Sequence, residues 1–412
     1  MYHWPERAGK AMQTNKEIQL HQEDVRRIVS SIFHAHWSSS LWHTNDSSRI
    51  DEAVAALDGA NYRKFVAQCL FFFNLGSNAV DVTKGPLSMG ELVESICRHP
   101  LDSFNFQTSG TTGRKKTIPY RLHVLAGECM ALAPLLGSRR RLVSVVPEHH
   151  IFGFAFSVIL PKFLGIPVVR MAPLPTGSFL DCLCDGDLVL AFPRFWQALL
   201  SILEHHQEPL PKYLDLKGIS STAPCPPEVL DGLLDHLLCE VTEIYGSTET
   251  SAVGYRMSPR RPYTLLANWE RTGEGAEVRI VRRHVDGTKG EPQPLLDRVE
   301  WVSGRQFFPQ GRYDHAVQVG GVNVYPQKIA KMIETHPDVS ECAVRLMRPE
   351  EGVRLKAFIV PAPAVHLDEC SERFGNRFRR WLQQRLPAPA CPKMFAFGVK
   401  LPRNPLGKLS DW

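Results

Sequence analysis

The middle of the chain alternates between short apolar runs and longer segments that carry apolar residues at helical spacing. The short runs are Arg141–Val146, Leu188–Ala191, Gly218–Ser221 and Glu240–Ile244. Helical periodicity is found between the last three of them, at residues 195–205 and 227–238. This alternation predicts a parallel α/β sheet, whose ligands bind beyond the carboxyl ends of the strands. We therefore expect the chemistry to lie in the loops that follow the strands.

Two polar loops follow predicted strands. Pro147–Gly153 comes after the first run and contains two adjacent histidines. Tyr245–Thr250 comes after the last run and supplies an aromatic face able to stack on a base, a glycine, hydroxyls and the carboxylate of Glu249. Mg²⁺ prefers such oxygen ligands. Taken alone, this loop fits an ordinary polar turn equally well, because turns favour the same residue types.

A third polar segment, the hydroxyl-rich segment Asn105–Lys116, holds four hydroxyl side chains, two glycines and a run of cations. Glycine lets backbone N–H groups approach phosphate oxygens, hydroxyls donate hydrogen bonds, and Lys or Arg neutralises charge. Neither the Walker spacing nor the dinucleotide fingerprint occurs here, and such a segment by itself is more often a solvated turn. Its combination with Tyr245–Thr250 favours a magnesium–ATP site.

The flanking regions have different patterns. Ser88 and Glu91 form a capping-box pattern at the start of one helical segment. Helical spacing precedes residue 100 at Gln22–His36, Arg49–Leu57, Ala60–Leu75 and Met89–Arg98. Short strands separated by turn residues follow residue 255, at Glu277–Arg283, Val299–Val302 and Phe307–Phe308.

A compact unit follows Asp314. It reads as helix 327–335, strands 340–347 and 355–361, helix 368–386 and strand 394–401. The predicted fold class is α/β: a large N-terminal domain of α/β layers with parallel-rich sheets and a β-rich subdomain, plus a small mobile C-terminal α+β domain. The predicted boundaries are 1–313 and 315–412, with a hinge at Asp314.

Composition limits the classes of function. The chain has 412 residues, of which 43% are hydrophobic and 22% charged, so two or three folded domains are expected. A net charge of +5 suits anionic substrates but is weak evidence for nucleic acid, and we expect no nucleic-acid partner. No apolar run approaches the ~20 residues of a membrane span, and the start lacks a signal-peptide pattern. With ten scattered cysteines that fit reduced thiols, a cytoplasmic location is expected.

Taken in order, several motifs resemble those of the adenylate-forming superfamily, which includes acyl- and aryl-CoA ligases, luciferases and nonribosomal peptide adenylation domains. The resemblance covers about Phe104 to the C-terminus. The motifs are TSGTTGRKK (108–116), PEHHIFG (147–153), STAP (221–224), YGSTE (245–249), GGVNVYP (320–326) and PLGK (405–408).

The resemblance implies a role for each motif. Tyr245 would stack on adenine, Thr248 would bind the α-phosphate and Glu249 would hold Mg²⁺. His150 would lie against the acid and help to gate the thiol tunnel. The other implied nucleotide contacts are Thr108, Ser109, Gly110, Thr111, Thr112, Gly113, Lys116, Ala223, Pro224, Gly246 and Ser247, and the implied acid-pocket residues are Phe152, Ser221 and Thr222.

The resemblance extends to the C-terminal part of the chain. Asp297 lies fourteen residues before Gly311, a common spacing of the family's ribose-binding Asp ahead of its Gly-Arg. Asp297 and Arg312 are therefore assigned to the ribose hydroxyls. Asp314 matches the hinge residue, and Lys408 stands at the position of the catalytic lysine.

The sequence also departs from the family pattern. Lys115 stands where the phosphate loop usually has Pro, and Thr117 where it has Gly. Leu295-Leu296 replaces the Thr-Gly ahead of the ribose Asp, and Lys328-Ile329-Ala330 replaces a Glu-Ile-Glu. The N-terminal part is about a hundred residues shorter than the resemblance leads one to expect, so one subdomain is expected to be trimmed.

The resemblance implies ATP-dependent activation of a carboxylic acid, aryl or modest acyl, to an acyl-adenylate. Transfer to a thiol follows, either of coenzyme A or of carrier-protein phosphopantetheine. Two rivals stay open: a kinase-like ATP-dependent transferase, which would release ADP and not AMP, and a non-catalytic binder of acyl-adenylate or CoA. A homodimer is also open.

Overall fold

The computed structural model describes residues 18–37, 47–82, 85–107, 116–205, 215–273, 278–313, 316–348, 350–402 and 412. These residues form two compact units. The small unit comprises Lys116, Leu296–Arg298 and Pro309–Trp412, and the large unit comprises the other described residues. The predicted hinge, Asp314, lies outside the described residues, so its role stays a prediction.

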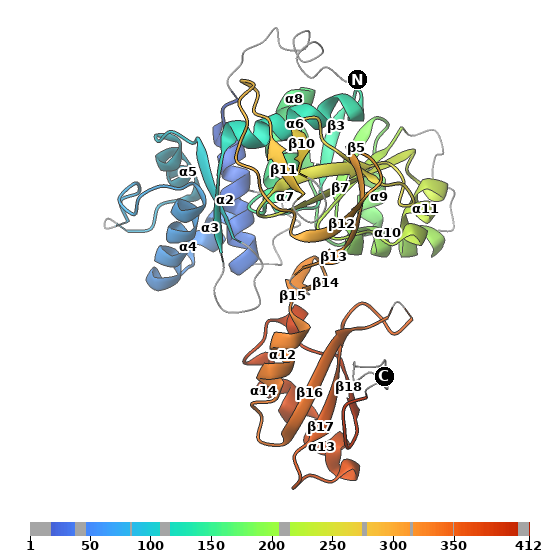
Figure 1. Cartoon of the computed structure of the whole chain (residues 1–412). Coiled ribbons are helices and arrows are strands. Elements are labelled where there is room, and N and C mark those ends of the chain that lie inside the picture. The colour runs from blue at the N-terminus through green and yellow to red at the C-terminus, as the bar shows by residue number, and fades with distance from the viewer. Residues whose placement is uncertain are drawn as a thin grey trace. The chain divides into compact units, whose positions relative to one another are not determined.

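The large unit begins with helices at the four predicted segments. They are α2 (Gln22–His36), α3 (Ser47–Ala55), α4 (Gly59–Phe72) and α5 (Met89–Cys97), drawn in blue in Figure 1. The predicted capping box at α5 is confirmed, because the Ser88 side chain accepts a hydrogen bond from the Glu91 N–H and the Glu91 carboxylate accepts one from the Ser88 N–H.

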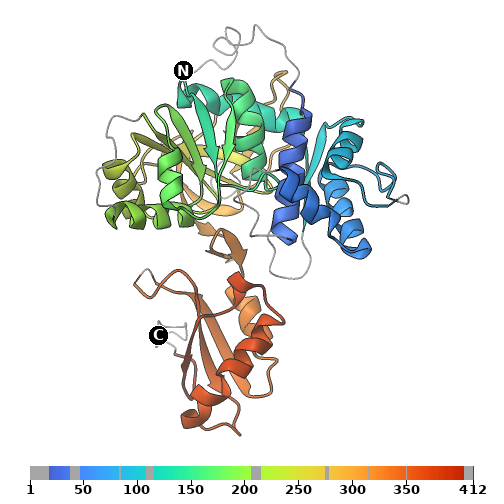
Figure 2. The same cartoon turned by 180° about the vertical axis from the view of Figure 1, so that it is seen from behind.

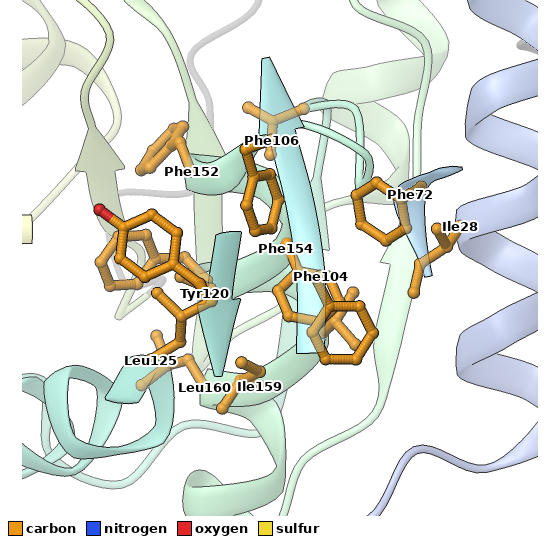
Figure 3. Packing of buried hydrophobic residues seen from close by; sticks show 14 of the residues in the cluster. Ile28, Phe72, Phe104, Phe106, Tyr120, Leu125, Phe152, Phe154, Ile159 and Leu160 are labelled. Atoms are coloured by element: carbon orange, nitrogen blue, oxygen red, sulfur yellow. The ribbon is translucent and has the colours of Figure 1, made fainter. Parts of the chain in front are cut away.

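A two-stranded hairpin follows, made of β1 (Ser103–Gln107) and β2 (Thr117–Arg121), with Gln107 opposite Thr117. Residues 108–116, the rest of the hydroxyl-rich segment, connect these two strands. On β1 the buried rings of Phe104 and Phe106 alternate with more exposed residues, as expected for a strand with one face in the core. Phe104 packs against Phe154 with ring centroids 4.5 Å apart, and Figure 3 shows the surrounding cluster.

The main sheet has nine strands among the described residues, in the order β12-β13-β9-β8-β7-β6-β5-β3-β4. The strands from β4 to β7 are parallel to one another, whereas β8 and β9 are antiparallel to their neighbours. This is the parallel α/β arrangement that the alternation of segments predicts. The bounds are β3 (Arg141–Ser144), β4 (Val168–Arg170), β5 (Asp187–Ala191), β6 (Lys217–Ser220), β7 (Glu240–Ser247), β8 (Ser251–Arg256), β9 (Tyr263–Leu265), β12 (Asp297–Trp301) and β13 (Gln306–Arg312).

Helices cover both faces of the parallel strands, as Figures 1 and 2 show. Leu142 and Leu188 belong to the hydrophobic cluster that includes α6 (Leu122–Leu136) and α8 (Leu160–Leu164). Their neighbours Val143 and Val189 point to the other face. That face packs against α9 (Gly177–Cys182), α10 (Pro193–His205) and α11 (Pro227–His236). Burial on both faces explains why these strands read as continuous apolar runs.

Short elements complete the large unit. After β3 come α7 (Ile151–Gly153) and a π-helical turn, η2 (Phe154–Ile159), which leads directly into α8. A separate antiparallel hairpin is formed by β10 (Trp269–Thr272) and β11 (Arg279–Arg282). No helix in the described ranges is long and apolar enough to cross a membrane.

The small unit is α+β. Its sheet has the order β16-β17-β18, antiparallel between the first pair and parallel between the second. Leu401 and Trp412 both pack in one apolar cluster with Phe358 of this sheet, and the Lys356 ammonium donates to the Trp412 backbone oxygen at 3.0 Å. The elements are β14 (Val317–Val319), β15 (Val322–Val324), α12 (Pro326–Ile333), β16 (Val339–Leu346), β17 (Leu355–Pro361), η4 (Leu367–Glu369), α13 (Cys370–Arg373), α14 (Asn376–Gln383), η5 (Ala388–Ala390) and β18 (Met394–Phe397).

One predicted helix of this unit is wrong as a single element. The segment 368–386 is broken between α13 and α14, where Gly375 adopts φ −76° and ψ −139° and stands at the N-cap of α14. Glycine has a low helix propensity and tolerates such a backbone conformation. Phe374 and Phe378, on either side of the break, both lie in the core, where they are 3% and 1% exposed.

Candidate functional site

The carboxyl end of β6 lies beside the middle of β7, since Ser220 pairs with Glu243 and β7 continues to Ser247. The STAP segment follows β6 directly. The Ser221 hydroxyl donates to the Ile244 carbonyl at 2.9 Å, which fixes the start of this segment against β7. Thr222 has a φ of +79°, a left-handed conformation that is strained for a β-branched residue. Thr222 and Pro224 are exposed and Ala223 is half-buried, so the segment faces outward at the strand ends.

The loop predicted at Tyr245–Thr250 begins later than expected, and this part of the prediction is wrong. Tyr245, Gly246 and Ser247 continue β7, because β8 pairs antiparallel with it and brings Ser247 opposite Ser251. Gly246 sits at a register shift and is exposed. A Cβ atom there would lie 2.0 Å from the Ser251 carbonyl oxygen, so only glycine fits. The connection is therefore a tight turn, Thr248–Thr250.

The side chain of Ser247 stabilises this turn from within. Its hydroxyl accepts hydrogen bonds from the N–H groups of Glu249 and Thr250, each at 3.2 Å. Thr248 and Glu249 are half-buried. No group of three or more His, Cys, Asp or Glu ligands gathers anywhere in the described ranges. The Glu249 carboxylate supplies oxygen atoms of the kind that Mg²⁺ prefers as ligands.

Tyr245 is half-buried and packs on one side against other aromatic rings. Its ring centroid lies 5.5 Å from that of Tyr263 and 5.2 Å from that of Phe307. The Arg256 guanidinium lies over the Tyr263 ring at 4.5 Å. These contacts fix the orientation of Tyr245, as a residue that stacks on a base requires.

Sequence reasoning missed Glu243, which organises the same strand ends. Its carboxylate pairs with Arg256 at 2.6 Å and accepts a hydrogen bond from the N–H of Cys225, the residue after the STAP segment, at 3.0 Å, so it joins the end of that segment to β8. Glu243 is 3% exposed. The sequence feature that could have indicated its role is the position of this carboxylate within the mostly apolar strand segment Val241–Ile244. Burial raises the pKa of the Cys225 thiol, which disfavours the thiolate that a nucleophilic cysteine needs.

The loop Pro147–Gly153 is held by its buried residues. A Cβ on Gly153 would lie 1.9 Å from the Pro147 carbonyl oxygen, so glycine is required for this compact path. Buried Glu148 pairs with Arg170 at 2.9 Å. Ser31 of α2 accepts a hydrogen bond from the Glu148 N–H at 3.0 Å, and its hydroxyl lies 2.8 Å from His149 Nδ1.

The two predicted acid-contacting residues of this loop differ in exposure. The His150 side chain is exposed, with its ring centroid 4.5 Å from that of His149. Phe152, in contrast, is only 9% exposed, packs against Phe156 at a centroid distance of 5.4 Å, and belongs to the hydrophobic cluster shown in Figure 3. His150 is therefore accessible to a substrate, whereas Phe152 is mainly a core residue.

A hydrogen bond joins the β1–β2 hairpin to the β7–β8 turn. The Tyr120 hydroxyl on β2 donates to the Thr248 carbonyl at 2.9 Å. Tyr120 stands three residues after Thr117, the first residue of β2, so about 10 Å of strand separates Tyr120 from Thr117, which directly follows the hydroxyl-rich segment. The segment residues Thr108, Ser109, Gly110, Thr111, Thr112 and Gly113 lie outside the described residues, whereas Lys116 is described and exposed.

In the small unit, the strand ends that carry the predicted ribose residues lie next to each other. Asp297 begins β12 and Arg312 ends β13, and both are half-buried. The Tyr313 N–H donates to the Leu296 carbonyl at 3.2 Å, which ties together the residues beside them. Lys408 lies outside the described residues, so its assignment stays a prediction.

Two family models match the sequence. Residues 97–300 match the model described as AMP-binding enzyme, and residues 328–408 match the AMP-binding enzyme C-terminal domain. Together they cover all the motifs named above except GGVNVYP (320–326), which lies between the two matched regions.

Relatives of known activity align with nearly the whole chain. The 4-coumarate–CoA ligase of Halorhodospira halophila is 32% identical over 403 residues, which covers 95% of this chain and 99% of that protein. The 4-coumarate–CoA ligase of Rhodobacter capsulatus is 34% identical over 382 residues, covering 88% and 92%. The region before the hydroxyl-rich segment is therefore matched in length by the first of these relatives.

Solved structures share the fold. The amide bond synthetase of Marinactinospora thermotolerans superimposes with a TM-score of 0.60 at 16% identity, covering 94% of this chain and 92% of that one. The o-succinylbenzoate CoA synthetase of Bacillus subtilis gives a TM-score of 0.61 at 16% identity, covering 94% and 91%.

Proposed function

The chain belongs to the AMP-binding enzyme family, and from this premise we propose that it is an AMP-forming acid–thiol ligase. It activates a carboxylic acid with ATP to an acyl-adenylate and then transfers the acyl group to a thiol. The observation that carries the proposal is the Tyr120–Thr248 hydrogen bond, because it ties the hairpin of the hydroxyl-rich segment to the turn of the YGSTE motif.

Adenylation solves a leaving-group problem. A carboxylate is a poor acylating agent because its leaving group would be oxide, whereas a mixed anhydride with AMP has a good one. In the first step a carboxylate oxygen attacks the α-phosphorus in line and pyrophosphate leaves. In the second step a thiol attacks the acyl carbon and AMP leaves. Catalysis of the first step is mainly positioning and neutralisation of charge.

Each proposed residue has a task in this chemistry. Tyr245 stacks on adenine, and Asp297 and Arg312 hold the ribose. Thr248 binds the α-phosphate and Lys408 neutralises the charge that develops there. Glu249 would hold Mg²⁺, which supplies charge neutralisation at the phosphates. The remaining nucleotide contacts are proposed at Thr108, Ser109, Gly110, Thr111, Thr112, Gly113, Lys116, Ala223, Pro224, Gly246 and Ser247.

The proposed acid is planar and aromatic. The two relatives described above are named as ligases of 4-coumarate, an aryl acid. Ala223 and Gly246 are small enough to leave room for a flat substrate. Ser221, Thr222 and the exposed His150 supply polar groups beside it. Phe152 acts from beneath as part of the supporting core.

Coenzyme A is the proposed acceptor, with the phosphopantetheine of an acyl carrier protein as the alternative. The relatives are named as CoA ligases. Arg377 and Arg380 are exposed on α14 and would suit the phosphates of CoA or the acidic surface of a carrier protein. A cytoplasmic location is also proposed, since all ten cysteines are free thiols.

A pyrophosphate-release screen tests the proposal. Aryl acids, including 4-coumarate, and fatty acids are offered with Mg–ATP, and CoA and a carrier protein are then supplied separately. We expect acid-dependent release of pyrophosphate with AMP as the final nucleotide, and the highest rate with an aryl acid. Release of ADP would indicate a kinase-type transferase, and nucleotide binding without any acid-dependent release would indicate a non-catalytic binder.

The proposed hinge gives a second prediction. If the small unit turns about Asp314 between the two steps, Asp314→Pro should reduce thioester formation by at least about tenfold more than adenylate formation, because proline fixes φ. Asp314→Ala, which leaves the backbone free, is the matched control. The measurement compares single-turnover rates of pyrophosphate and thioester formation, and equal loss of both in the proline variant contradicts the hinge.

A further inference from the structure

We propose that Tyr120, Glu128 and Arg282 are positioning residues that hold the turn Thr248–Thr250 in the geometry required for adenylation. The inference rests on the proposed function, which assigns Thr248 and Glu249 of this turn to the nucleotide and its metal. None of the three residues belongs to a motif found in the sequence.

Glu128 contacts the end of the turn from α6. Its side chain is 0% exposed. One carboxylate oxygen accepts hydrogen bonds from the Ser251 hydroxyl at 2.6 Å and from the Ala252 N–H at 3.2 Å. The other oxygen pairs with the Arg282 guanidinium. Ser251 adopts a φ of +54°, so this hydrogen-bonded carboxylate supports a residue in an uncommon backbone conformation.

Arg282 contacts the turn from β11. Its second terminal nitrogen donates to the Thr250 carbonyl at 2.6 Å. The guanidinium lies 4.2 Å from the ring centroid of Trp269, whose indole N–H donates to the Ala252 carbonyl at 2.7 Å. Arg282 is 6% exposed, so these bonds are shielded from competing water.

Tyr120 completes the support at the beginning of the turn, through its hydroxyl bond to the Thr248 carbonyl. Tyr120 and Glu128 both follow the hydroxyl-rich segment, on β2 and α6. Main-chain oxygens of Thr248 and Thr250 and the hydroxyl of Ser251 are thus all bound by side chains from outside the turn. The network fixes the turn relative to the hairpin that carries the hydroxyl-rich segment.

The buried ion pair is better explained by positioning than by stability. Replacing a buried ion pair with well-packed apolar residues is often neutral or stabilising, because desolvation offsets the attraction between the charges. Apolar residues at 128 and 282 could fill the space, but they could not accept from Ser251 and Ala252 or donate to Thr250. What the charged pair adds is therefore its hydrogen bonds to the turn.

The double variant Glu128→Met/Arg282→Met tests this, because methionine fills similar space without leaving a buried charge. We expect a lower melting temperature, because the buried Ser251 hydroxyl, Ala252 N–H and Thr250 carbonyl lose their partners. We also expect faster amide hydrogen exchange in residues 248–252, and adenylation slowed by about 10- to 100-fold through misplacement of the turn. The matched control is Arg141→Met/Asp187→Leu, which removes a 2.7 Å ion pair at the amino ends of β3 and β5. The control should leave both the exchange in the turn and the adenylation rate unchanged.

Tyr120→Phe provides a second variant that removes only a hydroxyl. We expect it to fold as the wild type does, to slow adenylation by several-fold and to speed exchange in the turn. This variant decides the question if the double variant does not fold. Wild-type exchange and wild-type rates in Tyr120→Phe, or in a folded double variant, would overturn the proposal.

The exchange measurement separates this inference from the proposed function. If the wild-type protein releases no pyrophosphate with any acid, the proposed function fails, but exchange still reports whether the three side chains hold the turn. If the wild type is active and exchange in the variants is unchanged, the positioning role fails and the proposed function stands.

Discussion

Lys408→Ala is expected to reduce the rate of adenylate formation by about 10²–10³-fold, the usual cost of removing one preorganised charge donor from a developing anion. Binding of Mg–ATP should change little, because the proposed contacts with adenine, ribose and magnesium come from other residues. Once formed, the adenylate should still react with the thiol, since the second step does not use this lysine. The variant should therefore fail in the forward adenylation step alone.

Acid-dependent pyrophosphate exchange measures the first step, nucleotide titration measures binding, and thioester formation from synthetic acyl-adenylate measures the second step. Lys400→Ala is the matched control, because Lys400 is an exposed lysine of the same unit. Unchanged pyrophosphate exchange in Lys408→Ala would refute the assignment of this lysine. An equal loss of pyrophosphate exchange in Lys400→Ala would show that the rate depends on the overall positive charge of the unit and not on Lys408 in particular.

Gly246→Ala is expected to damage both stability and activity. The added Cβ would lie 2.0 Å from the Ser251 carbonyl oxygen, a backbone atom that can move only if β7 and β8 separate. Such overpacking costs about 1–3 kcal/mol in the free energy of unfolding. Separation of the strands would also displace the turn, and a shift of about 1 Å can reduce the rate by about 10²-fold.

Denaturant unfolding and pyrophosphate release measure the two effects of Gly246→Ala. Gly177→Ala is the matched control, because a Cβ at Gly177 meets nothing within 4 Å and the residue starts a helix, where alanine is favoured over glycine. We expect the control to keep wild-type activity and equal or slightly greater stability. A Gly246→Ala protein with wild-type stability and rate would show that the hairpin adjusts without cost.

The candidate site was predictable where its signals are local. Tyr245, Thr248 and Glu249 belong to one short motif at the end of a predicted strand, and the structure places that motif beside the STAP segment through the pairing of β6 with β7. The strand at β7 nevertheless runs further than expected. Its last residues are polar and include a glycine, and only their pairing with β8 makes them a strand.

The supporting residues were not predictable in this way. Glu128 and Arg282 are 154 positions apart in the chain. Neither residue lies in a sequence motif that would indicate a functional role. Glu243 lies within an apolar run, where its charge signals that a partner is needed but does not identify Arg256. Buried charges require partners, but the sequence does not say which of many candidates the fold brings near.

By itself the sequence determined the helices at the start of the chain, the alternation of strands and helices in its middle and the motif series that identifies the family. These features depend on residue periodicity and on residues close together in the chain, so they can be read without a fold. Only the tertiary structure decided where β7 ends, how the helix near Gly375 breaks and which buried side chains hold the turn at Thr248. These features depend on contacts between segments that are distant in the sequence. Such contacts contribute to stability only after the chain has folded and brought the segments together.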